Sequence, residues 1–333
     1  MSDHKLDIAF WDYDRTRALA DGTVKIDGAD ARFHSGKIVT EIFEAMIREH
    51  AYDVSELGMT YFLRTIEVDD PPYLAIPVFP VRSFRHGAIY INKASGIERP
   101  EDLNGKTIGE LALYGHDAGT MPKGMLSDEY GFRPETCRWI IGSIDFPIRP
   151  VDYIPQTHPD NVEVTRASEG SDLGKMLEAG EIDALISADI PKCILLKSPK
   201  VRRLFEDYET VEHDYYRRTG IFPIMHTVVV KKQLIDNLPD LVKAVYSGFC
   251  DAKQMQIDQY VKGMTFNNMQ LMIPWLTKLI GDDRAVLGDD WWPYGVDANR
   301  AALDAVLRYH HEQGLTKRRF NIEDVFVPYL LDT

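Results

Sequence analysis

Arginines in closely spaced pairs are the first feature of the chain that could do chemistry. The pairs are Arg15/Arg17, Arg82/Arg85 and Arg217/Arg218. A guanidinium group presents several N–H donors in one plane, so it can grip a carboxylate through two parallel hydrogen bonds. Because an anion with several negative charges needs more than one cation, we predict that these residues bind an anionic substrate. The alternative for each residue is a solvated side chain or a surface ion pair.

Histidine is the side chain that most readily exchanges a proton near neutral pH. Of the ten histidines, His226 lies in the apolar segment 224–228 and His86 follows the second arginine pair, where a strand is expected to begin. We predict that one of these two is catalytic and prefer His226, although a hydrogen-bonded core role is the alternative for both. We further predict that His116 and Asp117, on an expected loop after the strand 106–111, contact the substrate.

Signatures of nucleotide or metal chemistry are missing from the sequence. No Gly-x-Gly-x-x-Gly or phosphate-binding loop follows a strand, and His-Glu-x-x-His and Gly-x-Ser-x-Gly do not occur. Adjacent helical residues such as His310 and His311 point about 100° apart, so they do not converge on one ion. Asp12 and Asp14 have arginine neighbours that would oppose a divalent cation. We therefore expect no metal and no organic cofactor.

Charge and composition restrict the classes of partner. The 333 residues include 52 Asp+Glu and 38 Lys+Arg, which gives a formal net charge of −14. Such a chain repels nucleic acid and anionic lipid, and its apolar runs are too short to span a membrane. The three cysteines are far apart and no Cys-x-x-Cys occurs, so reduced thiols are expected. Since the N-terminal segment carries no export signal, we expect a cytoplasmic protein.

The elements that must position these residues alternate between strands and helices, which predicts an α/β protein with mostly parallel sheets and crossover helices. Expected strands cover 6–11, 24–33, 52–57, 73–81, 86–92, 106–111, 139–141, 162–164, 184–187 and 222–231. Expected helices cover 38–50, 172–179, 238–260, 268–280 and 298–313. The prolines within 73–81 place that strand at a sheet edge or in a crossing segment.

Two segments resemble the signature of the second lobe of type II periplasmic-binding-protein folds. Residues 96–109 read Gly-Ile-Glu-Arg-Pro-Glu-Asp-Leu-Asn-Gly-Lys-Thr-Ile-Gly, and residues 176–186 read Met-Leu-Glu-Ala-Gly-Glu-Ile-Asp-Ala-Leu-Ile. The resemblance implies a two-lobed α/β fold with mixed sheets, an interlobe cleft and a helical C-terminal region. We expect residues 1–90 and 225–333 to form one lobe and residues 91–224 to form the other.

Three further segments resemble the cofactor-independent 4,5-dihydroxyphthalate decarboxylases, and the similarity extends over nearly the whole chain. They are residues 10–17 (Phe-Trp-Asp-Tyr-Asp-Arg-Thr-Arg), 76–86 (Ile-Pro-Val-Phe-Pro-Val-Arg-Ser-Phe-Arg-His) and 215–226 (Tyr-Tyr-Arg-Arg-Thr-Gly-Ile-Phe-Pro-Ile-Met-His). Residues 113–124 depart from the family pattern "Met-Thr-Ala…Trp-x-Arg-Gly", because His116, Asp117 and Lys123 stand there. The substitution pattern of the substrate therefore stays open.

The resemblance implies non-oxidative decarboxylation of a hydroxylated aromatic dicarboxylate in phthalate degradation. The expected reaction converts 4,5-dihydroxyphthalate to 3,4-dihydroxybenzoate (protocatechuate) and CO2. One alternative is a cytoplasmic binding or sensor protein for aromatic acids on the same fold. Another is an enzyme of pyrimidine-precursor synthesis, although a conspicuous Cys-, His- or Lys-rich site is missing. The segment 291–294, Trp-Trp-Pro-Tyr, either packs on the first lobe or buries a homo-oligomer interface.

Overall fold

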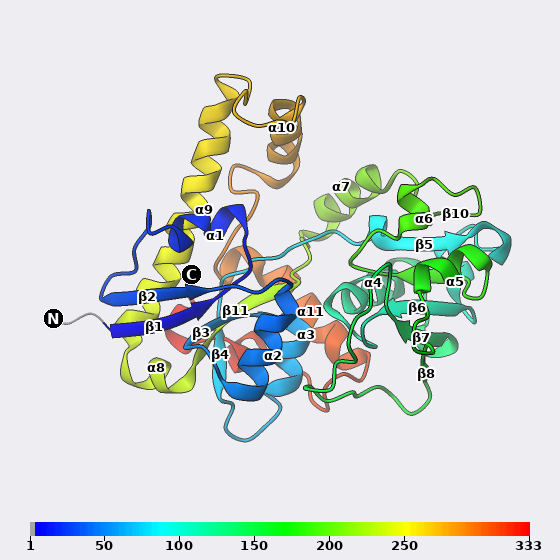
Figure 1. Cartoon of the computed structure of the whole chain (residues 1–333), viewed down its shortest axis with the longest axis horizontal. Coiled ribbons are helices and arrows are strands. Elements are labelled where there is room, and N and C mark those ends of the chain that lie inside the picture. The colour runs from blue at the N-terminus through cyan, green and yellow to red at the C-terminus, as the bar shows by residue number, and fades with distance from the viewer. Residues whose placement is uncertain (1–3) are drawn as a thin grey trace.

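Two mixed β-sheets lie side by side along the long axis of the molecule (Figure 1). The computed structural model describes residues 4–333. Residues 1–3, which belong to the N-terminal segment behind the expectation about export, lie outside the described residues. The strand order is β2-β1-β3-β11-β4 in the first sheet and β10-β5-β9-β6-β7-β8 in the second. The predicted alternation of strands and helices therefore produces two sheets.

The first sheet combines the N-terminal strands with one strand from much later in the chain. Its strands are β1 (His4–Ala9), β2 (Ala29–His34), β3 (Val54–Gly58), β4 (Tyr73–Ile76) and β11 (His226–Lys231). Helices α1 (Asp14–Ala20), α2 (Val39–Glu49) and α3 (Met59–Thr65) follow β1, β2 and β3. β1 runs parallel to β2 and β3, whereas β11 is antiparallel to β3 and β4. β4 is an edge strand, and Pro77 and Pro80 of the predicted strand 73–81 lie beyond its end, in the segment that leads to the second sheet.

The second sheet has a parallel centre with two antiparallel strands at one end. Its strands are β5 (Ile89–Asn92), β6 (Thr107–Leu111), β7 (Arg138–Gly142), β8 (Glu163–Arg166), β9 (Ala184–Ile186) and β10 (Val201–Arg203). Its helices are α4 (Asp117–Tyr130), α5 (Leu173–Ala179), α6 (Lys192–Leu195) and α7 (Tyr208–Thr219). β6 to β9 pair in parallel, and β5 and β10 pair antiparallel. Short 3-10 helices are η1 (His86–Ala88), η2 (Lys93–Ser95), η3 (Pro100–Leu103), η4 (Pro134–Thr136), η5 (Asp297–Asn299) and η6 (Pro328–Leu330).

Two crossing segments connect the sheets and run alongside each other. The outgoing segment leaves β4 for β5, and the returning segment leads from α7 into β11. Arg82 and Ile224 form an antiparallel bridge between them, and the Met225 amide donates to the Val81 carbonyl at 2.9 Å. The motifs at 76–86 and 215–226, distant in sequence, are therefore neighbours in space. The lobe boundaries at 90/91 and 224/225 stay predictions.

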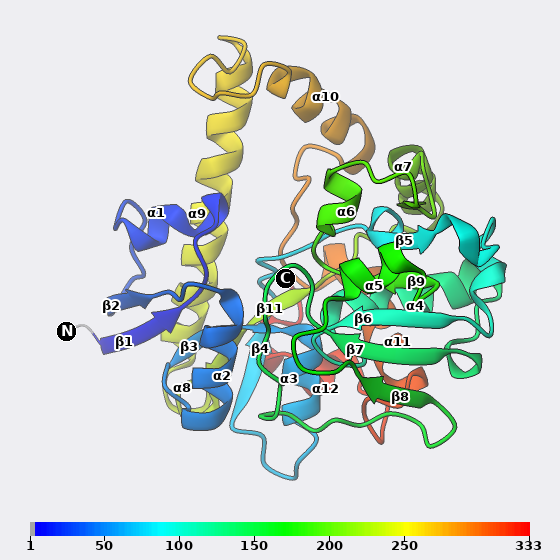
Figure 2. The ribbon, with the colours of Figure 1, turned by 45° about the vertical axis from the view of Figure 1, so that its right-hand side comes forward.

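Helices dominate the chain after β11, as the sequence predicts. They are α8 (Lys232–Asn237), α9 (Pro239–Met264), α10 (Leu276–Leu287), α11 (Arg300–Glu312) and α12 (Ile322–Val325). α9 packs on α1, whereas α11 packs on α4 of the second sheet (Figure 2). The helix predicted at 268–280 begins only at Leu276. Asn267 and Asn268 interrupt it because both adopt left-handed backbone angles, with φ of 53° and 48°.

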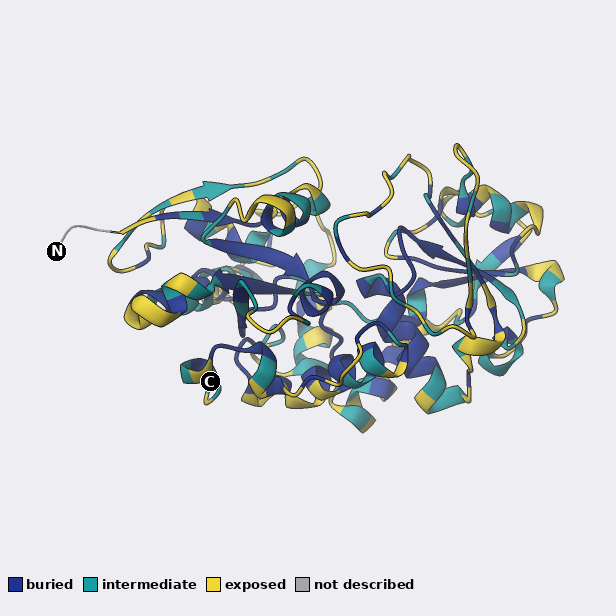
Figure 3. Cartoon of the chain, turned by 90° about the horizontal axis from the view of Figure 1, so that it is seen from below, coloured by how far each residue is buried: buried dark blue, intermediate teal, exposed yellow. Residues whose placement is uncertain are grey.

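Buried side chains form a core that continues from one sheet to the other (Figure 3). One cluster of buried hydrophobic residues contains Leu6 and Ile8 of β1 together with Leu185 of β9. A second cluster, which includes Ile108 and Trp139, covers the opposite side of the second sheet. Within residues 4–333, no helix has the length and apolar character needed to cross a membrane.

Candidate active site

His226, the first residue of β11, forms a close polar pair with Glu56 of the adjacent strand β3. The His226 Nδ1 lies 2.6 Å from the Glu56 Oε1. The Glu56 side chain is fully buried, and the His226 side chain is 12% exposed. Because the Nδ1 hydrogen is directed at the carboxylate, Nε2 is the nitrogen left to exchange a proton with a ligand. His226, which was predicted from the sequence, therefore has one ring nitrogen available to a ligand.

Glu56 accepts two further hydrogen bonds that hold it in place. Its Oε2 accepts from the Trp11 backbone N–H at 3.0 Å, and its Oε1 accepts from the Tyr13 hydroxyl at 2.7 Å. Burial is the main reason that the pKa of Tyr13 rises far above its usual value, so its hydroxyl keeps its proton. The Phe43 ring meets the His226 ring edge-on at 5.2 Å. The imidazole is thus fixed by polar and aromatic contacts.

Glu56 was not among the site residues predicted from the sequence. A signal was present, because a carboxylate in the middle of the expected strand 52–57 must either face solvent or have a buried partner. β3 is buried along its whole length, so the Glu56 carboxylate must have a buried partner. Trp11 and Tyr13 belong to the family-like motif 10–17, in which the prediction singled out only the arginines.

Asp117 begins helix α4 and approaches the same place from the second sheet. Its Oδ1 accepts the Thr60 backbone N–H at 2.6 Å, whereas its buried Oδ2 has no hydrogen-bond partner within residues 4–333. Burial raises the pKa of Asp117 to about 6, and the charges of His226 and Arg85 oppose that rise. Asp117 can therefore change protonation near neutral pH, and one of its oxygens is available to a ligand.

His116 ends the loop after β6, as predicted, and is the N-cap of α4, whereas Asp117 lies in the helix, which corrects its predicted loop position. Its Nδ1 accepts the Ala118 N–H at 3.1 Å, so Nε2 carries the hydrogen. Burial, followed by the charge of Arg85, lowers the pKa of His116 to about 3. The neutral ring can donate a hydrogen bond to a ligand but does not act as an imidazolium acid at neutral pH.

Arg85 places a buried positive charge near Asp117 and His116. It is 7% exposed, and its Nε lies 3.3 Å from the Met225 sulfur. No hydrogen bond among residues 4–333 uses its two terminal nitrogens. Burial lowers the pKa of Arg85 to about 10 and Asp117 opposes the decrease, so the guanidinium stays charged at neutral pH. Arg85 can therefore offer two donors to an anion, and substrate binding by Arg85 stays a prediction.

Arg82, the other member of that pair, is hydrogen-bonded inside the protein, and substrate binding by Arg82 stays a prediction. Its guanidinium donates to the carbonyls of Phe222 at 3.1 Å and Pro293 at 2.9 Å, and to the Asn299 side-chain oxygen. Burial lowers the pKa of Arg82 to about 9. Because these acceptors use both terminal nitrogens, Arg82 ties the crossing segments to the C-terminal region.

Arg15 lies on α1 next to the Glu56 network. Its guanidinium packs against the rings of Tyr13 at 4.3 Å and Trp292 at 4.5 Å. Its Nε donates to the Pro80 carbonyl at 2.5 Å, and its Nη1 pairs with Asp14 at 3.1 Å. The side chain is 17% exposed. Arg15 is therefore held near the His226 pair through Tyr13, in keeping with its predicted role.

The remaining predicted arginines lie away from His226, on the surface. Arg17 is exposed and pairs with Asp12 at 3.1 Å. Arg217 and Arg218 are exposed on α7, where Arg218 pairs with Glu129 at 2.7 Å. Their guanidinium groups are solvated or paired at the surface, and substrate binding by these three residues stays a prediction.

His86, the second catalytic candidate, is a core residue of the second sheet. It is 1% exposed, and the rings of Phe205 and Tyr215 each lie 5.2 Å from its ring. Neither ring nitrogen has a hydrogen-bond partner within the described chain. Burial lowers the pKa of His86 to about 4, so it is neutral at physiological pH. The alternative that the sequence left open, a core histidine, describes this placement.

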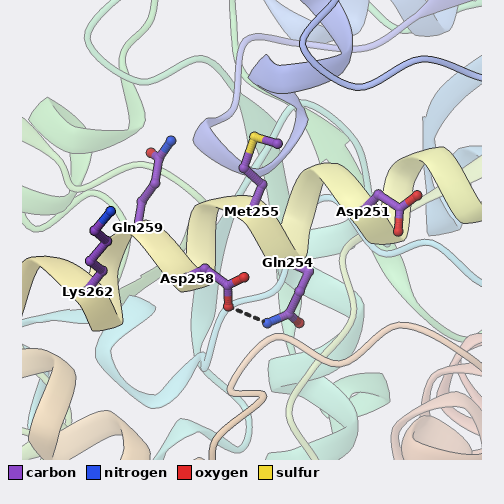
Figure 4. Close-up of a pocket in the computed structure, with 6 residues that line it drawn as sticks. All are labelled: Asp251, Gln254, Met255, Asp258, Gln259 and Lys262. Atoms are coloured by element: carbon purple, nitrogen blue, oxygen red, sulfur yellow. Dashed lines mark hydrogen bonds between the residues drawn. The ribbon is translucent and has the colours of Figure 1, made fainter.

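A separate hollow of about 380 Å³ runs along one face of α9 (Figure 4). All of its lining side chains come from that single helix: Asp251, Gln254, Met255, Asp258, Gln259 and Lys262. It offers one cation among two carboxylates, which does not suit a dicarboxylate. Within residues 4–333, no three His, Cys, Asp or Glu side chains are grouped so that they could hold a metal ion.

Sequence comparison finds two relatives of the same description. A 4,5-dihydroxyphthalate decarboxylase of Comamonas testosteroni is 33% identical over 333 residues, which cover 100% of this chain and 99% of that protein. A 4,5-dihydroxyphthalate decarboxylase of Pseudomonas putida is 36% identical over 217 residues, which cover 65% of this chain and 83% of that protein. No family model matches the chain.

Comparison with solved structures confirms the predicted fold class. The periplasmic aliphatic sulphonate binding protein SsuA from Escherichia coli superposes with a TM-score of 0.55 at 12% identity, covering 98% of this chain and 92% of that one. The alkanesulfonate-binding protein SsuA from Xanthomonas axonopodis pv. citri gives a TM-score of 0.52 at 12% identity, covering 99% and 98%. The chain therefore has the α/β fold of type II periplasmic binding proteins.

Proposed function

The chain belongs to the 4,5-dihydroxyphthalate decarboxylase family, and from this premise we propose that it converts 4,5-dihydroxyphthalate to 3,4-dihydroxybenzoate and CO2. The observation that supports the proposal best is the Glu56–His226 pair next to Asp117, whose Oδ2 has no partner within residues 4–333. A fixed histidine beside a carboxyl group with a pKa of about 6 is an arrangement suited to proton transfer.

Substrate binding is assigned to the cations and donors around this pair. Arg85 grips one carboxylate through its terminal nitrogens, and Arg15 contributes the second positive charge. His116 donates from Nε2. Asp117, in its ionised form, accepts the hydrogen of the ring hydroxyl that lies para to the departing carboxylate. Ionisation of that hydroxyl sends electron density into the ring, toward the carbon that must be protonated.

Proton delivery is assigned to His226. Its Nε2–H protonates the ring carbon that bears the departing carboxylate, while Glu56 stabilises the imidazolium. The bond between the ring and the carboxylate then breaks, its electron pair stays in the ring, and CO2 leaves. Asp117 returns its proton to the product hydroxyl, and His226 regains a proton from water. One proton enters and one CO2 departs, so the step requires no oxidant or reductant, and we propose that it proceeds without metal or organic cofactor.

The test is CO2 release from purified protein supplied with 4,5-dihydroxyphthalate. His226→Asn should keep the fold and substrate binding and lose about 10²- to 10⁴-fold in turnover, which is the usual contribution of a positioned acid or base. The matched control, His158→Asn, changes an exposed histidine and should keep full turnover. Glu56→Gln should retain the shape of the site and lose turnover through the missing charge.

Three results would contradict the proposal. One is near-normal turnover by His226→Asn. A second is loss of wild-type activity on chelation with recovery on adding a divalent metal, which would contradict cofactor independence alone. The third is tight binding of the dihydroxyphthalate without CO2 release, which would favour the binding or sensor protein instead.

A further inference from the structure

Helix α9 extends beyond the body of the protein and carries an arm. Its 26 residues span about 39 Å at 1.5 Å per residue. Its buried positions lie at Ile257 or earlier, with the exception of Gly263. Figures 1 and 2 show the rest of the helix rising past the first sheet, with α10 turning back beside its end. α10 contacts α7. We call residues 258–287 the arm and residues 265–277 the tip.

The tip exposes large apolar side chains that a folded chain normally buries. Met272 is 101% exposed, Met269 77%, Trp275 75% and Phe266 54%. Leu271 and Ile273 add to the same surface. From these fractions, the six side chains expose roughly 800 Å², which is about the area that each partner buries in a stable protein–protein interface.

The tip also lacks charge. No Asp, Glu, Lys or Arg occurs from residue 265 to residue 277, although 27% of the whole chain is charged. Comparable uncharged runs at 71–81 and 219–230 contain the largely buried strands β4 and β11. The other two uncharged runs of this protein are therefore largely buried, whereas the uncharged tip lies at the surface.

Internal contacts give the tip a definite shape. The side-chain amide of the buried Asn268 donates to the Thr277 hydroxyl oxygen at 3.0 Å, and its backbone N–H donates to the Gly263 carbonyl at 2.8 Å. A Cβ at Gly263 would lie 2.2 Å from the Asn268 Oδ1, so only glycine permits this close approach. A surface fixed in this way loses little conformational entropy on binding.

We propose that the tip is the interface through which two copies of this chain associate. A net charge of −14 opposes contact between copies over most of the surface, whereas the uncharged tips can meet without like charges facing each other. A membrane is the less suitable occupant, because the tip has no basic residue to attract anionic lipid. Since the area is sufficient without help from other surfaces, a two-fold dimer of facing tips is the expected assembly.

The test compares two variants that each add two negative charges. Met272→Asp/Trp275→Asp should raise the dimer dissociation constant about 100-fold or more, because each change removes an apolar anchor. The control, Leu195→Asp/Leu196→Asp, alters two side chains that are 61% and 74% exposed beyond the arm, and should remain dimeric. Sedimentation velocity gives the mass, and circular dichroism with thermal unfolding shows that both variants fold.

Cross-linking provides a measurement that does not depend on destabilising the interface. In a two-fold dimer, Gln270→Cys copies meet near the axis and should form a disulfide on mild oxidation, whereas the exposed control Lys200→Cys should not. Wild-type protein that stays monomeric at its highest soluble concentration would overturn the proposal. So would dimers that persist in Met272→Asp/Trp275→Asp, or monomers that bind phosphatidylcholine vesicles through the tip.

Discussion

Asp117 and Arg85 both leave hydrogen-bonding capacity unused inside the protein. Asp117 has a buried oxygen without a partner, and the terminal nitrogens of Arg85 make no hydrogen bond within residues 4–333. Polar groups inside a protein that lack a hydrogen-bond partner lower the stability of the folded state unless a ligand supplies the missing partner. Arg82, which is equally buried, donates through both terminal nitrogens to three acceptors, and its Nε has no partner within residues 4–333. At the residue scale, the free terminal nitrogens distinguish Arg85, which can bind an anion, from Arg82, whose terminal nitrogens are used inside the protein.

Asp117→Asn should make the substrate-free protein more stable at alkaline pH. The folded pKa of Asp117, about 6, exceeds the usual value of 3.8. Between these values the folded state holds a proton that the unfolded state lacks, so stability falls as pH rises through this window. Above it the ionised carboxylate costs about 3 kcal/mol in full, which the amide avoids. Urea unfolding at pH 4 and pH 8 measures the difference.

At pH 4 the free energies of unfolding of wild type and Asp117→Asn should differ little, because the buried carboxyl is then protonated. Asp332→Asn, which changes an exposed carboxylate, is the control and should show no pH-dependent gain. Turnover by Asp117→Asn should fall even as its stability rises. Lower stability of Asp117→Asn at pH 8 would show that the carboxylate is stabilised by contacts rather than strained by burial.

Arg85→Ala should weaken substrate binding, whereas Arg82→Ala should lower the stability of the fold. Loss of the Arg85 grip on a carboxylate should weaken substrate binding about 30- to 150-fold, or about 2–3 kcal/mol, and leave the melting temperature close to wild type. Arg82→Ala removes the donor to the Phe222 carbonyl and to the Asn299 side-chain oxygen, whereas the Pro293 carbonyl still accepts from the Asn299 side-chain amide. This change should lower the free energy of unfolding by about 3 kcal/mol. Isothermal titration and thermal unfolding separate the two. Equal effects of both changes on binding would contradict this division.

Glycine-rich packing explains at the element scale why helix α4 could not be predicted. The helix 38–50 was predicted from its apolar spacing, whereas no helix was predicted at 117–130, where Gly119, Pro122 and Gly124 lower the helix propensity. The two glycines meet tertiary demands instead. A Cβ at Gly119 would lie 1.7 Å from the Glu110 Oε1, and one at Gly124 would lie 2.1 Å from the Tyr309 ring. Tertiary contact, invisible in a single sequence, overrides helix propensity here.

The same limit applies to Glu56, the site residue that β3 contributes. His226, Arg85 and Arg15 could be found because their motifs resemble a family. Glu56 could not be assigned, because its role depends on the register in which β3 lies against β11. Register follows from the packing of the whole sheet and not from the local pattern.

Gly124→Ala should destabilise the contact between α4 and α11. The added methyl group would meet the buried ring of Tyr309, so the helices must separate, and overpacking of this kind costs about 1–3 kcal/mol. Gly281→Ala on α10 is the matched control, since no atom lies within 4 Å of its Cβ position. It should be neutral or add about 0.5–1 kcal/mol through helix propensity. Chemical denaturation of both variants gives the comparison, and a Gly124→Ala protein as stable as wild type would contradict the tight packing.

Two sheets could behave as two independent units, but the whole molecule contains several connections that couple them. The hydrophobic cluster that includes Ile8 of β1 also includes Leu185 of β9, so no polar boundary separates the sheets. The paired crossing segments join them again. α11 adds a third connection, because its Arg308 and Tyr309 both hydrogen-bond to Asp128 of α4.

We therefore expect wild-type protein to unfold in one calorimetric transition, with a calorimetric enthalpy equal to the van't Hoff enthalpy. Asp128→Ala removes the acceptor shared by Arg308 and Tyr309 and so weakens the α11 connection without touching His226 or its partners. Coupling between the sheets should fall, which broadens the transition or divides it into two. Asp332→Ala, at an exposed position, is the control and should leave the single transition unchanged.

Two resolved transitions in the wild type would show that the continuous core does not couple the sheets. An unchanged sharp transition in Asp128→Ala would assign the coupling to the core and crossing segments alone. Because the candidate site takes Glu56 and His226 from the first sheet and Asp117 from the second, a loss of coupling should also lower turnover before either sheet unfolds.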